Sequence, residues 1–350
     1  MYESFYGLSD KPFQLNPDPS FYFGSQQHRR AMSYLEYGIH QSEGFIVITG
    51  EIGAGKTTLV RSLFEKLDST KVLAAHMVTT QLDASDTLRI VAAAFGLESA
   101  RKDKAELLLG LEAFFVATAA EGKRCLLVVD EAQNLTPAAV EELRMLSNFQ
   151  LETHALLQTF LVGQPEFRNT LQSPTMEQLR QRIIATAHIG AMSATETQGY
   201  IEHRLGHVGW SGIPRFAPDA FLAIHEHSGG IPRRINAICD RLLWYGFLGD
   251  KKAFARNEVL EVAEEMRSEF KGQPTVVIGS GESPAGSSPS QLDLPMSAVA
   301  GSGVHDQLAL LDRDLLRLES TLLRIERNHL ESTKLSRRMV KALEQGRDET

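Results

Sequence analysis

Short apolar runs alternate with longer amphipathic stretches between residues 44 and 192. The five runs read FIVIT (45–49), VLAAHMV (72–78), CLLVV (125–129), LLQTFLVG (156–163) and IIATAHI (183–189). Apolar character on both faces is typical of buried strands in a parallel sheet. The intervening segments, such as 86–97 and 104–120, have helical periodicity. This alternation predicts an α/β layered domain with a parallel sheet over residues 44–192.

The segments on either side of this domain have different patterns. Residues 1–43 begin with aromatic, proline-punctuated sequence and end in an amphipathic helix over 26–41, and we expect them to pack on the core. Residues 193–270 contain consecutive helical patterns separated by glycine and proline, which predicts a small all-helical domain. Here SATE (193–196) and APDA (217–220) place N-cap residues at the expected helix starts.

The C-terminal part divides into a linker and a tail. Glycine, proline and serine supply about half of residues 271–305 and aromatic residues are absent, which predicts a disordered linker. In residues 306–350, apolar residues recur at alternating spacings of three and four: Leu308, Leu311, Leu315, Leu318, Leu322 and Ile325. The spacing predicts a helical tail that forms a short coiled coil with itself or with a partner. The alternative is a helix that packs on the body of the protein.

The composition narrows the function. It is 43% hydrophobic and 23% charged, as in a globular protein with a core. The 44 acidic residues outnumber the 36 lysines and arginines, which argues against a non-specific nucleic-acid binder. Cys125 and Cys239 lie in apolar or helical patterns, so no disulfide is expected. No signal peptide and no transmembrane run is visible, so we expect a cytoplasmic protein, attached to the inner membrane at most through partners.

Candidate chemistry begins in ITGEIGAGKTTLV (48–60), a glycine-rich loop between a predicted strand and a predicted helix. It fits the phosphate-binding pattern G-x-x-x-x-G-K-[ST] in the context that this P-loop requires. Glycines let backbone N–H groups turn around a phosphate, and the helix directs its positive end at the same anion. We expect Lys56 to reach the β- and γ-phosphates of ATP and Thr57 to hold Mg²⁺. The predicted nucleotide-binding residues are Gly50, Glu51, Ile52, Gly53, Ala54, Gly55, Lys56, Thr57 and Thr58.

An acidic pair follows the third apolar run, in CLLVVDEAQNL. Ligands of parallel sheets bind at the carboxyl ends of strands, where Asp130 and Glu131 are placed. We expect Asp130 to hold Mg²⁺ and Glu131 to orient and polarise the attacking water. The alternative is a solvated strand end, but the P-loop upstream favours hydrolysis of ATP to ADP and phosphate.

Four further side chains are candidates for the catalytic set. Gln164 would lie beside both motifs if its strand neighbours both, where it could sense the γ-phosphate; the alternative is a turn residue before proline. Either Arg180 or Arg182 could be offered to the γ-phosphate of a neighbouring subunit, unless both are surface arginines. Arg233, at the start of a helix in the helical domain, could couple nucleotide state to domain angle.

The P-loop, VVDEAQ, VGQPEF, LRQRI and GGIPRRIN together resemble an AAA+ ATPase. Within that class, FYGLSDKPFQLNPDPSFYFGSQQHRRAMSYLEYGI and LRMLSNFQLE are similar to the general secretion pathway protein A (ExeA-like) family. GFIVITGEIGAGKTTLVR is most similar to ATPases associated with the exosortase A (PEP-CTERM) and exopolysaccharide system. The resemblance covers about residues 1–270.

The resemblance implies a P-loop NTPase (AAA+) domain with a parallel five-stranded core sheet and helices on both faces. It also implies a helical lid and nucleotide-dependent homo-oligomers, either rings or dimers. By analogy, Gln164 is the first sensor, Arg182 the arginine finger and Arg233 the second sensor.

Three functions remain at this point. The first is an ATPase that powers or switches assembly of a bacterial envelope export system through a protein partner. The second is a DNA-handling ATPase of the transposition-helper type, which the acidic charge balance disfavours. The third is a scaffold that binds ATP without turnover, which Lys56, Asp130 and Glu131 make the least favoured.

Overall fold

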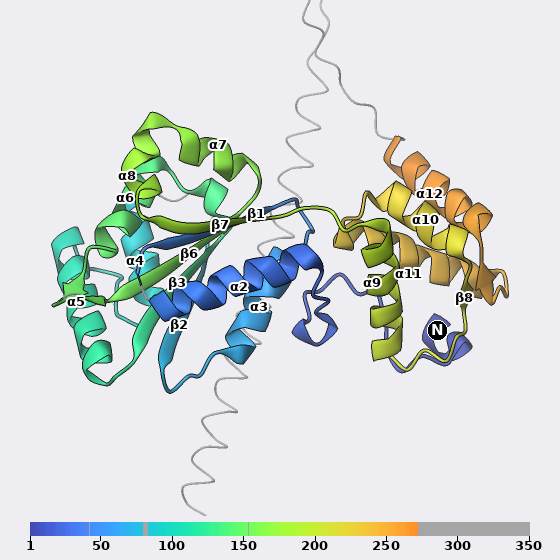
Figure 1. The fold of residues 1–350 in the computed structure, drawn as a ribbon, viewed down its shortest axis with the longest axis horizontal. Helices are drawn as coiled ribbons and strands as arrows, with labels where there is room; N and C mark the ends of the chain where they lie inside the picture. Colours follow the sequence, from blue (N-terminus) through green and yellow to red (C-terminus); the bar gives the residue numbers. More distant parts are fainter. Residues whose placement is uncertain (42, 80–82, 153, 272–350) are drawn as a thin grey trace, which may run out of the picture. The chain divides into compact units, whose positions relative to one another are not determined.

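The computed structural model describes residues 1–41, 43–79, 83–152 and 154–271 (Figure 1). The amphipathic helix predicted over residues 26–41 is present as α2 (Gln26–Gln41), at the predicted bounds. The predicted linker, from residue 272 onward, and the predicted coiled-coil tail lie outside the described residues.

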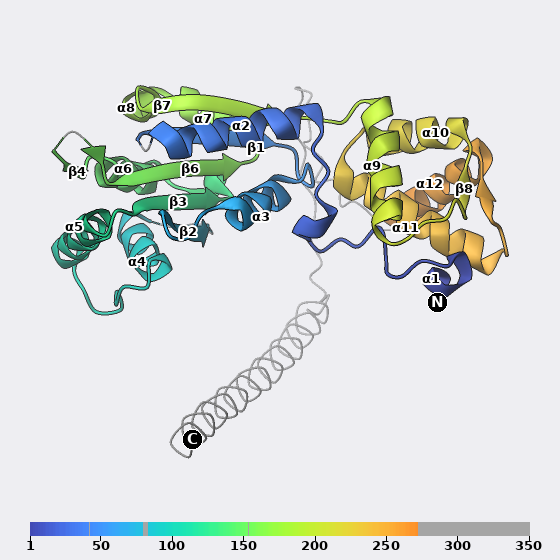
Figure 2. The same ribbon diagram turned by 60° about the horizontal axis from the view of Figure 1, so that its bottom comes forward.

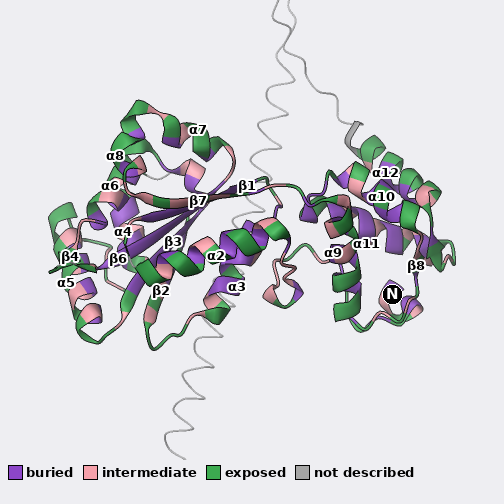
Figure 3. Cartoon of the chain, in the orientation of Figure 1, coloured by how far each residue is buried: buried purple, intermediate pink, exposed green. Residues whose placement is uncertain are grey.

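A five-stranded parallel sheet forms from the five apolar runs. Its strands are β1 (Phe45–Gly50), β2 (Val72–Val78), β3 (Arg124–Asp130), β6 (Leu157–Gly163) and β7 (Ile183–Ile189). The order is β2-β3-β6-β1-β7, with every neighbouring pair parallel (Figure 2). The three inner strands are buried almost throughout, whereas the edge strands alternate, so the predicted sheet is confirmed (Figure 3).

Helices cover both faces of this sheet because successive strand side chains point to opposite sides. Phe45 and Val47 of β1 belong to one apolar cluster, and Ile46 and Ile48 belong to another. The first cluster includes α4 (Ala84–Ala94), α5 (Lys104–Ala120), α6 (Pro137–Leu146), α7 (Glu166–Gln172) and α8 (Glu177–Arg180). The second includes α2 and α3 (Lys56–Lys66). A short hairpin, β4 (Gln150–Leu151) with β5 (His154–Ala155), precedes β6.

The lid has its own apolar cluster, built from α9 (Ala194–His207), α10 (Pro218–Ser228), α11 (Pro232–Leu248) and α12 (Arg256–Lys271). Ser193 caps α9 in a reciprocal capping box with Glu196, as predicted. The prediction for α10 was wrong in detail, because its N-cap is Ala217, which offers no side-chain acceptor. The lid is also not purely helical: β8 (Arg215–Phe216) pairs in parallel with β9 (Ala253–Phe254).

The N-terminal segment packs on two bodies rather than on the core alone. Tyr2 and Tyr6 of α1 (Tyr2–Tyr6) are buried in the lid cluster, together with Phe13 and with Phe21 of η1 (Pro19–Phe21). The Tyr2 hydroxyl donates to Asp240 of α11 at 2.5 Å. α2 packs on the sheet, and Tyr22, which precedes it, is partly buried against the same cluster. Tyr2, Tyr6, Phe13 and Phe21 remove their apolar area from water against the lid helices, so the expectation that residues 1–43 pack on the core holds for α2 and Tyr22 but not for these four side chains.

Within the described ranges, the helices are too short or too polar for any of them to be a candidate membrane span.

Two helical glycines differ in their surroundings and allow a matched stability test. A Cβ on Gly38 of α2 would lie 2.7 Å from Ile46 Cγ1 and 2.9 Å from Phe160 Cε1, whereas a Cβ on Gly110 of α5 would meet nothing within 4 Å. We expect Gly110→Ala to raise the free energy of unfolding by about 0.5–1 kcal/mol through helix propensity. Gly38→Ala should lower it by about 1–2 kcal/mol through overpacking. Urea titration followed by circular dichroism measures both, and a stabilised Gly38→Ala would show that α2 is not held this closely to the sheet.

Candidate nucleotide-binding site

The P-loop connects β1 to α3 and closes on its own lysine. Lys56 is only 6% exposed, and its Nζ donates to the carbonyls of Gly50 at 2.7 Å and Glu51 at 3.0 Å. Gly53 and Gly55 have φ angles of 80° and 92°, the left-handed region that favours glycine. Burial lowers the pKa of Lys56, while the nearby Glu131 and Asp130 carboxylates oppose that shift. The P-loop therefore encloses the ammonium group of its own lysine, which two loop carbonyls hold in place.

The acidic pair lies at the carboxyl end of β3, beside the start of α3. The Thr57 hydroxyl donates to Asp130 Oδ2 at 3.1 Å, and Asp130 is 3% exposed. The other carboxylate oxygen, Oδ1, accepts the Glu131 backbone N–H at 2.9 Å. His76 of β2, which the sequence did not single out, places Nε2 at 3.9 Å from Asp130 Oδ2. Thr57 and Asp130 are thus brought together as predicted.

Glu131 and Gln164 also meet. Because β6 pairs with both β1 and β3, Gln164 follows a strand that neighbours both motifs. Its Nε2 donates to Glu131 Oε2 at 3.3 Å. Gln133, which sequence reasoning missed, donates from Nε2 to the same carboxylate oxygen at 2.6 Å. The position of Gln164 agrees with the prediction, and its sensor role remains a proposal.

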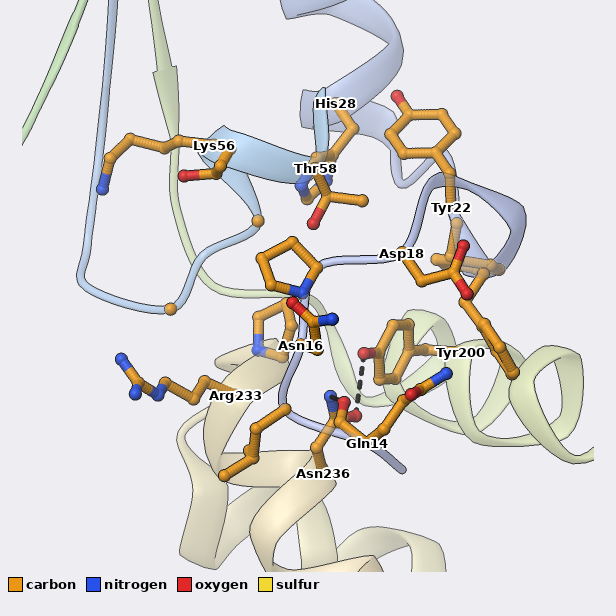
Figure 4. A pocket seen from close by; sticks show the side chains of 18 of the residues that line it. Gln14, Asn16, Asp18, Tyr22, His28, Lys56, Thr58, Tyr200, Arg233 and Asn236 are labelled. Carbon is orange, nitrogen blue, oxygen red and sulfur yellow. Dashed lines mark hydrogen bonds between the residues drawn. The ribbon is translucent and has the colours of Figure 1, made fainter. Parts of the chain in front are cut away.

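The start of α11 reaches the P-loop directly. The Arg233 backbone N–H donates to Gly53 O at 3.1 Å, and a Cβ on Gly53 would lie 2.4 Å from Arg233 Cβ. Only a glycine permits this contact between loop and lid. The Arg233 side chain lines the same cavity as Lys56 and Glu131 (Figure 4). The structure therefore places the predicted lid arginine at the nucleotide-binding loop.

The cavity beside the P-loop has a volume of about 340 Å³. Its walls come from the P-loop, the lid and the segment before α2 (Figure 4). The wall residues that sequence reasoning missed include Gln14, Asn16, Asp18, Tyr22, His28, Tyr200, Arg204 and Asn236. The sequence contains one indirect indication of this wall. The prolines at 12, 17 and 19 favour an extended segment, and an extended segment exposes its backbone N–H and C=O groups. The sequence does not indicate which surface this extended segment lines.

A buried polar network fastens this segment to the lid. Arg204 of α9 donates to the Tyr200 hydroxyl at 2.9 Å and to Pro12 O at 2.5 Å. The Tyr200 hydroxyl donates to Asn236 Oδ1 at 2.8 Å, and Asn236 Nδ2 donates to Gln14 O at 3.4 Å. The Arg204 guanidinium also lies over the Phe21 ring, 4.6 Å from its centre. The N-terminal wall of the cavity is thereby held in place.

Arg180, the last residue of α8, and Arg182, two residues further on, do not line this cavity. Arg180 Nη1 donates to the carbonyls of Leu171 at 2.6 Å and Ser173 at 2.7 Å, which secures it to its own chain. Arg182 Nη1 donates to Ser147 Oγ at 2.8 Å. The role of either arginine toward a neighbouring subunit remains a proposal. Arg182 is the less restrained of the two.

The residues present fit a magnesium nucleotide. No side chain caps the start of α3 at Gly55, so the first N–H groups of this helix are free to face an anion. The hydroxyl of Thr57 and the carboxylate of Asp130 are the hard oxygen ligands that Mg²⁺ prefers. The glycine cradle, the enclosed Lys56 ammonium and the cavity together suit a phosphate chain with a base attached.

Comparisons with known proteins agree with this geometry. The family model described as AAA domain matches residues 39–171. Three solved structures share the fold: ORC2 of Aeropyrum pernix in its ADP form, Cdc6p of Pyrobaculum aerophilum, and Drosophila ORC bound to DNA. Their TM-scores are 0.57, 0.56 and 0.53 at 15%, 16% and 18% identity. The alignments cover 74%, 76% and 74% of this chain and 73%, 75% and 65% of those chains.

This chain has the fold of an AAA P-loop NTPase. General secretion pathway protein A of Aeromonas hydrophila is 37% identical over 267 residues, which are 76% of this chain and 48% of that protein. The chain thus spans about half the length of this curated relative. The AAA match includes the P-loop, the acidic pair and Gln164, and it ends before Arg180, Arg182 and Arg233. The AAA fold implies nucleotide binding.

His28 of α2 provides a test of how the P-loop is supported. It is 4% exposed, and its ring bridges Ala54 O at 2.9 Å and Ser25 Oγ at 2.6 Å. A carbonyl only accepts, so Nε2 carries the proton and Nδ1 accepts from the serine. Burial lowers the pKa of His28 below its ordinary value of 6.5. The folded chain therefore binds this proton less readily than the unfolded chain.

His28→Gln should lower the free energy of unfolding by about 1–2 kcal/mol at about pH 7.5. The stabilising contribution of His28 is full above pH 6.5 and is lost as the pH falls toward its lowered pKa, so the difference should shrink at about pH 5.5. Urea unfolding at both values measures this, with His40→Gln, exposed on the same helix, as control. An equal difference at both pH values would contradict the neutral bridge.

Proposed function

We propose that this protein is a magnesium-dependent ATPase. The observation that carries the proposal is the convergence of Thr57, Asp130 and Glu131 at the carboxyl ends of β1 and β3, with the Lys56 ammonium enclosed beside them. A site that only binds nucleotide needs no carboxylate beyond the magnesium ligand. Glu131 supplies a second one, and Gln164 contacts it from the neighbouring strand.

Each group has a defined task in this proposal. Lys56 and the first N–H groups of α3 bind the β- and γ-phosphates of ATP. Thr57 and Asp130 hold Mg²⁺, which neutralises charge that develops on the phosphate oxygens. Glu131 orients a water molecule for attack on the γ-phosphorus and accepts its proton, so that the products are ADP and phosphate.

The lid and the N-terminal segment supply the remaining contacts. Arg233 is the group that reaches from the lid to the γ-phosphate, because its backbone is already bonded to the P-loop. The segment around Gln14 and Asn16 is the wall for the base. Binding would then tie three parts of the chain to one ligand, which allows nucleotide state to change the angle of the lid.

We further propose that ATP turnover powers or switches assembly of a bacterial envelope export system. The similarity to general secretion pathway protein A supports this role, although the chain covers half of that protein. The resemblance of GFIVITGEIGAGKTTLVR to the exosortase- and exopolysaccharide-associated ATPases supports the narrower form. In this proposal the protein acts at the cytoplasmic side of the inner membrane, as a homo-oligomer with a protein partner.

One observation favours the DNA-handling alternative. A second groove, of about 670 Å³, runs between α2, β7 and the α7–α8 region. Its titratable lining residues are Arg30, Arg168, Arg180 and His188, and the described lining includes no acidic side chain. Such a groove suits a polyanion such as the DNA backbone. The formal net charge of −8 weighs against it, and the ATPase assay below includes a DNA arm.

The purified chain should hydrolyse ATP in the presence of Mg²⁺ and stop on addition of EDTA. Lys56→Ala should lose nucleotide binding by on the order of 100-fold, because it removes the charge at the phosphates. Glu131→Gln should keep binding and lose turnover by a similar factor. Steady-state phosphate release, with and without duplex DNA, measures both rates. Stimulation by DNA would move the assignment to the DNA-handling class, and an active Glu131→Gln would contradict the proposed base.

A mixing experiment tests the arginine finger. Arg182→Ala keeps its own nucleotide site, whereas Lys56→Ala keeps its Arg182; each alone should lose on the order of 10³-fold in activity. Mixed, they should recover a measurable fraction, because Lys56→Ala subunits offer Arg182 to the sites of their neighbours. Arg180→Ala is the matched control, since that guanidinium is held by two carbonyls of its own chain. Failure of the mixture to recover activity would assign Arg182 a role within its own subunit or none.

A further inference from the structure

A bridge of side-chain amides connects the carboxyl ends of β3 and β6. Gln133 lies in η2 (Ala132–Asn134), directly after the acidic pair. Its Nε2 donates to Glu131 Oε2 at 2.6 Å, and its Oε1 accepts the backbone N–H of Gln164 at 2.9 Å. One amide therefore fixes both the Glu131 carboxylate and the start of the Gln164 backbone.

The space around this amide is closed on the β6 side. A Cβ on Gly163, the last residue of β6, would lie 3.0 Å from Gln133 Oε1 and 3.4 Å from the Gln133 backbone nitrogen. Glycine at this position lets the Gln133 amide reach between the strands. The amide orientation is set by its partners, because the Gln164 N–H can only donate and a carboxylate oxygen can only accept.

Hydrogen bonds from neighbouring residues also fix the backbone of Glu131. Its φ of 55° places a non-glycine residue in the left-handed region, a strained conformation that persists only where neighbouring contacts enforce it. Thr79, 2% exposed directly after β2, shares its one hydroxyl proton between Glu131 O at 2.6 Å and Asp130 O at 3.0 Å. Asn134 Nδ2 in turn donates to Thr79 O at 3.1 Å. Thr79 thus holds the main chain of Glu131, whereas Gln133 and Gln164 hold its side chain.

We propose that Gln133 is a positioning residue for Glu131, acting through its amide bridge rather than by contact with nucleotide. This inference rests on the proposed ATPase function. Gln133 is not among the residues that line the nucleotide cavity, whereas Glu131 and Gln164 are. A carboxylate side chain has free torsions, and both amide donors bind Oε2, so neither of them occupies the other oxygen, Oε1. Losing the shorter of the two bonds would let the carboxylate leave the attack geometry without changing the P-loop.

The test uses Gln133→Met, which keeps the length of the side chain and removes both hydrogen bonds, in the full chain. We expect kcat to fall by about 10- to 100-fold, while KM and the affinity for a fluorescent ATP analogue stay within about twofold. Gln133→Glu should behave alike, because a second carboxylate repels Glu131. Gln178→Met, exposed on α8, is the matched control. Thermal unfolding of each variant verifies that it is folded.

A thermodynamic cycle separates positioning from a merely structural role. In the Glu131→Gln background, adding Gln133→Met should change the residual rate by less than about twofold, because the group that Gln133 positions is already gone. An unchanged or raised kcat in both Gln133 variants would overturn the proposal. So would an equal fall of the rate in the Glu131→Gln background, or a rise of KM that matches the fall of kcat. Absence of ATP hydrolysis by the wild-type chain would instead overturn the proposed function.

Discussion

The parallel pairing of β6 with both β1 and β3 is the constraint on which the candidate site depends. Residues 126 and 127 of β3 pair with 158 and 159 of β6, and 159 pairs with 45 of β1, so all three strands end at one edge. Strand ends in a parallel sheet point their last residues into one space. The P-loop, the acidic pair and Gln164 therefore converge although more than 100 positions separate the first from the last. A shift of β6 by one residue would turn its side chains to the opposite face and separate Gln164 from Glu131.

The P-loop is supported from three directions. Its lysine bonds the loop to itself, His28 bonds Ala54 from α2, and the Arg233 backbone bonds Gly53 from the lid. Each of these three bonds uses a backbone carbonyl of the loop as acceptor, so none of them occupies a loop N–H group. Since the three supports come from different parts of the chain, a ligand that changes the loop conformation acts on all three at once. In the proposed function, these contacts would link nucleotide state to lid position.

The two halves of the N-terminal segment pack on different parts of the protein. Its aromatic half completes the lid core and its helical half completes the sheet, so the extended chain between them crosses the nucleotide cavity. Arg204 is buried without a carboxylate within ion-pair distance in the part of the chain that the structure describes. Carbonyls, the Tyr200 hydroxyl and the Phe21 ring surround its charge instead. A buried cation satisfied in this way specifies one geometry, because each partner accepts only from a narrow direction.

Local sequence patterns determined most of the elements and motifs that could be predicted without the tertiary structure. The strands follow from apolar runs, α2 from its periodicity, and the P-loop and acidic pair from motifs whose chemistry requires those residue types. Periodicity records which face is buried, but it carries no information about what covers that face. Tertiary structure alone therefore decided that Tyr2, Tyr6, Phe13 and Phe21 pack on the lid, that His28 supports the P-loop, and that Gln133 joins two strand ends. These contacts join residues far apart in sequence, or set a side-chain direction that spacing leaves open.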